Sequence, residues 1–137
     1  MNPAWSGVRL GMESSPPPFI VFRSPKLERV DIYQLALDFT AKVEAIVHKA
    51  DARIHLRDRL DRGATAIAML VGQAVKDPVP SERRRSYRKA HALLVDCSTI
   101  LDIFARRSDL DRSLIGPAQK LVAELLTQLE QLRSQSV

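Results

Sequence analysis

SERRRSYRKAHALLVDCSTILDIFARR, residues 81–107, is the stretch that decides the fold. Apolar side chains recur in it at steps of three and four residues, which place them on one face of an α-helix. They are Tyr87, Ala90, Leu94, Cys97, Leu101 and Phe104. This strict spacing is typical of helices that pack nearly antiparallel in a bundle. The segment is therefore predicted to be a helix, with Ser81 as its N-cap after the proline-containing loop 76–81.

Three further segments show the same period, at about 26–49 or 31–49, at about 52–76, and from the stretch 108–113 to about 132. Their apolar stripes are Ile32, Leu35, Ala36, Phe39, Val43, Ile46 and Ala50; Leu56, Leu60, Ala64, Ile67, Val71 and Ala74; and Leu114, Ala118, Leu121, Leu125, Leu129 and Leu132. Short loops join the segments, and no strand pattern of period two occurs. The sequence predicts an all-α, antiparallel up-down-up-down four-helix bundle over residues 26–137.

Residues 1–25 differ from the rest, because they hold five of the eight prolines and two of the five glycines. This composition predicts an extended or disordered N-terminal tail. Its apolar run Phe19–Phe22 is expected to dock on the domain or on a neighbouring subunit. Met12 is a second candidate start, in which case residues 1–11 are not translated.

The chain has 137 residues, which suits one compact domain with a real core. Its single cysteine, Cys97, permits no intramolecular disulfide and fits a reducing cytosol. There is no run of about 18 apolar residues and no secretion signal, so we expect a cytoplasmic protein without a membrane partner.

The second half of the helix predicted over 52–76, ATAIAMLVGQAV (64–75), is apolar nearly all round. A helix that is apolar on every side is buried on every side. In so small a domain this indicates a second packing surface, most simply another subunit. The predicted oligomer interface consists of Ala66, Met69, Leu70, Phe19 and Phe22.

Residue patterns that support catalysis are missing. Each of the pairs Glu44/His48 and Asp51/His55 is spaced for an ordinary helix-surface contact. The Glu-x-x-His pairs of di-iron bundles do not occur, and neither do the glycine patterns of nucleotide-binding loops. Cys97 belongs to the apolar stripe, where a cysteine is usually a small core residue. We therefore predict no enzyme, no catalytic residue, no metal site and no cofactor.

Charge is the one feature that indicates a partner. The chain carries a net charge of +5, but residues 53–89 hold ten basic and four acidic residues, a net of +6. A localised basic region favours a phosphate-rich partner such as structured RNA. The candidate phosphate contacts are Arg57, Arg59, Arg62, Arg83, Arg84, Arg85, Arg88 and Lys89. They form two clusters, expected at opposite ends of an antiparallel helix pair.

The alternative is a solvated basic face that binds no nucleic acid. Acidic residues available to neutralise it are Asp58, Asp61, Glu82 and Asp96. Aromatic side chains for base stacking are nearly absent from the clusters, where only Tyr87 occurs and belongs to the core stripe. Any RNA contact is therefore expected to be made to phosphates, and to be sensitive to salt and weak in sequence preference.

The segment LRDRLDRGATAIAMLVG (56–72) resembles bacterial four-helix bundle proteins related to the 23S rRNA intervening-sequence protein. The residues that match are Leu56, Leu60, Arg62, Ala64, Ile67, Val71, Tyr87, Ala90 and Asp96. The sequence departs from the family's usual glutamine, serine and asparagine with Arg59, Ala66 and Leu70, and from its Glu-Gly pair with Gln73 and Ala74. It is also similar to the accessory variability determinant proteins of diversity-generating retroelements.

The resemblance implies a non-enzymatic homo-oligomer, a pentamer by analogy, that binds RNA and a protein partner such as a reverse transcriptase. Two functions stay open from the sequence. The first is a nucleic-acid-binding or RNA–protein adaptor module. The second is a structural or protein-interaction module that binds no nucleic acid.

Overall fold

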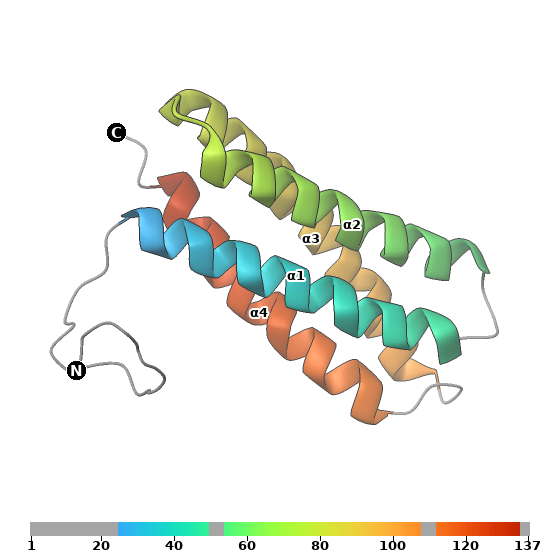
Figure 1. The fold of residues 1–137 in the computed structure, drawn as a ribbon. Helices are drawn as coiled ribbons and strands as arrows, with labels where there is room; N and C mark the ends of the chain where they lie inside the picture. Colours follow the sequence, from blue (N-terminus) through green and yellow to red (C-terminus); the bar gives the residue numbers. More distant parts are fainter. Residues whose placement is uncertain (1–24, 50–53, 108–111, 135–137) are drawn as a thin grey trace, which may run out of the picture.

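A computed structural model describes residues 25–49, 54–107 and 112–134, and these ranges are almost entirely helical (Figure 1). The helices are α1 (Pro25–Lys49), α2 (Ile54–Lys76), α3 (Pro80–Arg106) and α4 (Arg112–Ser134). No strand occurs in these ranges, so the prediction of an all-α four-helix bundle is confirmed. The predicted tail before Pro25 lies outside the described residues, and so does Ala50.

Each helix packs against two neighbours, in the closed order α1, α2, α3, α4 and back to α1. Across the described ranges, neither diagonal pair of helices is in contact. Neighbouring helices run in opposite directions, so the α2–α3 turn lies at the same end of the bundle as the start of α1 and the end of α4 (Figure 1). We call this end of the bundle, which carries the loop 77–79, the turn end.

The core lies inside this ring and is mostly aliphatic. The stripe predicted on α3 is buried along its whole length. Even its two end residues, Tyr87 and Phe104, are each only 2% exposed. On α1, five predicted positions are fully buried: Ile32, Ala36, Phe39, Val43 and Ile46. Leu35 and Leu56 are half-buried and pack against the edge of this core. The spacing of apolar residues therefore predicted correctly which faces of α1, α2 and α3 point into the core.

On α4 the predicted stripe was partly wrong. Ile115 and Val122 are buried, whereas the predicted Leu114 and Leu121 are only half-buried. The buried positions are Ile115, Ala118, Val122, Leu125, Leu129 and Leu132, which restores the same alternation of three and four that α3 shows. The reason is that Leu114 and Leu121 each directly precede another apolar residue, and either member of such a pair fits a helical period.

The predicted cap of α3 was also wrong. The helix begins at Pro80, one residue before Ser81, and its N-cap is Val79, which makes no side-chain cap hydrogen bond. Proline suits a first helical position, because its fixed φ is already helical and it has no N–H to satisfy. The backbone N–H of Val79 instead donates to Asp77 Oδ1 at 2.9 Å. An aspartate in the loop therefore orders the turn.

Helix α2 approaches both of its neighbours closely at glycines. A Cβ atom at Gly63 would lie 2.8 Å from Cys97 Sγ on α3, and one at Gly72 would lie 3.0 Å from Cε1 of Tyr33 on α1. Cys97 is fully buried, so its sulfur has little room to move. Gly63 thus fixes how near α2 can come to α3.

Gly63→Ala is expected to destabilise the bundle by about 1–3 kcal/mol, the usual cost of overpacking. Helix propensity alone predicts the opposite sign, since alanine is favoured over glycine by about 1 kcal/mol. Urea unfolding followed by circular dichroism measures the change. Cys97→Ala removes the sulfur, so the double variant should lose less stability than the sum of the two single variants. Strict additivity would contradict the proposed clash.

Candidate nucleic-acid interface

The first turns of α3 carry cations without acidic partners. Arg85, Arg88 and Lys89 are exposed and Arg84 is half-buried, and none of these four forms an ion pair with another described residue. We call these four residues the α3 basic patch. Between Glu82 and Asp96 this helix has no acidic residue. Glu82 is the nearest acid on α3, three residues before Arg85, and it forms no ion pair with a residue of the patch.

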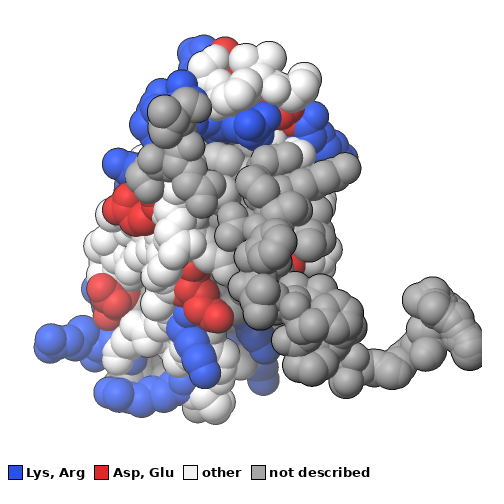
Figure 2. Space-filling model, turned by 90° about the vertical axis from the view of Figure 1, so that its left-hand side faces the viewer, with Lys and Arg blue, Asp and Glu red and all other residues white. Residues whose placement is uncertain are grey.

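The neighbouring part of α2 does not neutralise the patch either. Helix α2 packs antiparallel to α3, with Gly63 beside Cys97, so residues 71–76 run alongside the patch. Among them only Lys76 is charged, and it is itself a cation. Figure 2 looks onto the turn end of the bundle and shows Lys and Arg side chains around the turn at the top, with little acidic surface among them.

The patch wraps around α3 instead of forming a single row. Lys89 lies seven residues before Asp96 and therefore shares the face that contacts α2. Arg84 lies seven residues before His91, whose Nε2 is 3.7 Å from Glu130 Oε2 on α4. Arg88 points away from the buried stripe. Cations are thus presented over a wide arc of the helix.

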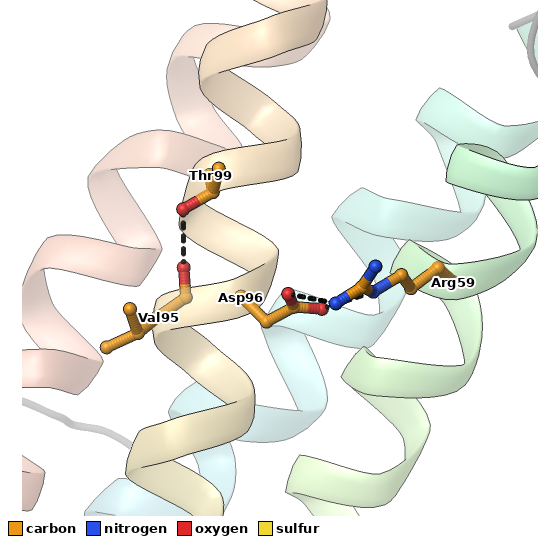
Figure 3. A network of polar contacts seen from close by, with 4 residues as sticks. All are labelled: Arg59, Val95, Asp96 and Thr99. Atoms are coloured by element: carbon orange, nitrogen blue, oxygen red, sulfur yellow. Dashed lines mark hydrogen bonds and ion pairs between the residues drawn. The ribbon is translucent and has the colours of Figure 1, made fainter.

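Arg59 is already engaged inside the bundle (Figure 3). It reaches from α2 to Asp96 on α3, with Nε donating to Oδ2 at 2.8 Å and Nη2 donating to Oδ1 at 2.7 Å. The two side chains are 62% and 35% exposed, so the pair contributes at most about 1 kcal/mol to stability. Its two-point geometry nevertheless engages Nε and Nη2 and places the Asp96 carboxylate beside the cation, which offsets its charge toward a phosphate.

The other predicted contacts outside the patch are engaged too. Arg62 Nη2 lies 3.0 Å from Asp58 Oδ2, one turn away on the same helix. Arg83 Nη1 donates to the carbonyl oxygen of Asp77 at 2.8 Å and so helps to hold the α2–α3 turn. Arg57 is half-buried and also has an interaction partner. Of the eight predicted cations, the structure leaves only the α3 basic patch without an interaction among the described residues.

The two predicted clusters stay apart within one chain. Arg59 is bound to Asp96, which follows Lys89, the nearest residue of the other cluster, by seven residues on α3. At 1.5 Å per residue this places Lys89 about 10 Å from that ion pair along the helix axis.

The residues predicted to form an oligomer interface have unequal surroundings. Leu70 is half-buried and packs against the chain's own core, and Ala66 is half-buried. Met69 is 60% exposed. Phe19 and Phe22 lie outside the described residues. Met69 is therefore the member of this set that leaves a large apolar side chain on the described surface.

Cys97 is buried in a setting that disfavours its thiolate. Burial, and secondly the negative charge of Asp96, raise the pKa of the thiol to about 12, although Arg59 acts in the opposite direction. Within the described ranges, no group of three or more His, Cys, Asp or Glu side chains is arranged to hold a metal ion. No helix in these ranges has both the length and the apolar character needed to cross a membrane.

The folded protein should react slowly with iodoacetamide at pH 8. Because the pKa of Cys97 is about 12, the reactive thiolate is a very small fraction of the thiol at that pH. Intact-mass measurements with and without urea give the two labelling rates, and the unfolded chain should be labelled far faster. Equal rates would show that the sulfur is accessible in the folded state.

No protein-family model matches the sequence, and no curated protein matches it either. Among solved structures, the fold is similar to that of a protein of unknown function from the S23 ribosomal protein family of Bacteroides thetaiotaomicron. The TM-score is 0.71 at 11% sequence identity, over 78% of this chain and 98% of the other. The two chains therefore share a fold, which is consistent with the resemblance to the 23S rRNA intervening-sequence proteins.

Proposed function

We propose that this chain is a non-enzymatic, homo-oligomeric four-helix bundle that binds structured RNA or joins RNA to a protein. The observation that carries the proposal is the α3 basic patch. Its four cations have no ion-pair partner among the described residues, and they lie beside a stretch of α2 without an acidic residue. Uncompensated cations on a rigid helix are suited to a polyanion.

The chemistry of the patch favours phosphate over bases. Arg84, Arg85 and Arg88 each offer a planar guanidinium that can hold a phosphate through two hydrogen bonds. Tyr87, which lies between Arg85 and Arg88 in the sequence, is 2% exposed and cannot stack on a base. Binding should therefore follow the shape and charge of the RNA more than its sequence.

Replacing Arg85, Arg88 and Lys89 with glutamine should weaken binding to a structured RNA at least about tenfold near physiological salt. The slope of log affinity against log salt should also become shallower by about 2 to 3, since three phosphate contacts are lost. Filter-binding titrations at two or more salt concentrations measure both quantities.

The matched control replaces Lys42, Lys49 and Lys120 with glutamine. These residues are exposed on α1 and α4 and carry the same total charge as the three residues replaced in the patch. If the control variant loses as much affinity as the patch variant, binding depends on net charge alone. If the unaltered protein does not bind at micromolar concentration, the proposal is wrong.

Homo-oligomerisation is the second element of the proposal. A patch of four cations is modest, and several copies on one assembly would strengthen the field and add avidity. The resemblance to ring-forming bundle proteins supports a pentamer. Size-exclusion chromatography with light scattering should then give about five times the 15.4 kDa chain mass. A monomer mass would overturn this element and leave the RNA test unaffected.

A role in binding another polypeptide without RNA is favoured by a different observation, the 60% exposure of Met69. In the adaptor role, a protein partner such as a reverse transcriptase would bind in addition to RNA. Affinity capture from the native cytosol, with and without nuclease, separates the two cases. Partners that persist after nuclease treatment, from a protein that binds no RNA in titration, would favour the pure interaction module.

A further inference from the structure

A groove of about 450 Å³ runs along the outside of α1 and α2. Its apolar part consists of Tyr33, Leu37, Ala68, Met69 and Gly72, and its polar part of Thr40, Thr65, Gln73 and Lys76. The close approach of Gly72 to the Tyr33 ring forms part of this surface. None of the lining residues is acidic, and Lys76 is the only one with a positive charge.

The groove exposes apolar surface that a monomer usually covers. Met69 is 60% exposed and Leu37 is 38% exposed, and they line the same groove from opposite helices. The hydroxyls of Thr40 and Thr65 donate to carbonyl oxygens of their own helices, so they can accept from a backbone N–H in the groove, whereas the Gln73 amide can both donate and accept. The groove therefore fits a short, extended apolar peptide, whose backbone needs polar partners as well as apolar contact.

We propose that the occupant is this chain's own segment Phe19–Phe22, the apolar run FIVF that precedes α1. The segment ends three residues before Pro25, the first residue of α1. Tyr33, at the start of the groove on α1, is eight residues after Pro25, or about 12 Å along the helix. Six extended residues, from Phe19 to Pro25, span about 20 Å. Residues 19–21 of the segment therefore reach the start of the groove by turning back along α1, and Phe22, about 10 Å from Pro25, lies just before it.

The short tether favours this occupant over a second copy of the chain. A segment joined to its site by a few residues has an effective concentration on the order of millimolar, which a separate chain in dilute solution does not reach. The inference concerns the α1–α2 groove alone and does not depend on RNA binding.

Disulfide trapping tests the position of the segment. In an extended peptide, neighbouring side chains face opposite sides, so Ile20→Cys and Val21→Cys sample both orientations. Each is combined with Met69→Cys in the groove, or with Ala92→Cys, an exposed position on α3, as the control. Cys97 stays out of the reaction, since it is buried and its pKa is about 12.

A link within one chain to position 69 is expected to form at least about tenfold faster than to position 92, for one of the two tail positions. Peptide mapping and non-reducing gels measure the rate and separate links within a chain from links between chains. Equal rates at positions 69 and 92 would overturn the proposal. A link formed mainly between two chains would overturn it too, and would identify a second copy as the occupant.

The oxidation rate of Met69 gives an independent readout on the chain without added cysteines. Phe19→Ser combined with Phe22→Ser removes one apolar side chain from each side of the segment, and should speed sulfoxide formation at Met69 several-fold in hydrogen peroxide. Val8→Ser with Leu10→Ser is the matched control, and should leave the rate unchanged. N-acetylmethionine in the same sample reports the oxidant dose. An unchanged Met69 rate in the phenylalanine variant would contradict the proposed docking.

Discussion

Helix α2 packs closely against one neighbour at each of two glycines. Gly63 faces the buried sulfur of Cys97, and Gly72 faces the ring of Tyr33. These contacts set the position of residues 63–75, a stretch without charge. One side of that stretch lies beside the α3 basic patch, and the other lines the groove with α1. The surplus positive charge and the exposed apolar groove therefore meet on the same half of α2.

The placement of a few acids decides which cations are available. Arg59 and Lys89 lie along the same α2–α3 seam, but only Arg59 has an acid, Asp96, within hydrogen-bond distance. Asp58 pairs with Arg62 in the first half of α2, and the backbone carbonyl of Asp77 accepts a hydrogen bond from Arg83. Local net charge, which guided the sequence prediction, cannot distinguish a paired arginine from an available one. The structure therefore narrows eight candidate residues to four.

The sequence predicted the bundle and most of its core, because the spacing in α3 admits one buried face and Pro78, in the loop 77–79, follows the end of α2. It failed at α4, where Leu114 and Ile115 are adjacent and either could face inward; only packing against α1 and α3 selects the isoleucine. The pairing of Arg59 with Asp96 was missed because the two residues are far apart in sequence. A usable signal existed, since they stand almost symmetrically about Pro78, as expected for opposite positions on antiparallel helices.

Assembly geometry determines what the α3 basic patch can do. A site with about four phosphate contacts binds weakly and loses affinity steeply with salt. In a cyclic ring, one rotation axis relates all copies, so their patches lie at the same height along the axis and at the same distance from it. A structured RNA could then span several patches, and each further contact would benefit from the tether of the first. In an antiparallel dimer the patches would lie at opposite ends and act singly. Cyclic symmetry, more than copy number alone, would therefore convert this modest patch into an RNA-binding surface.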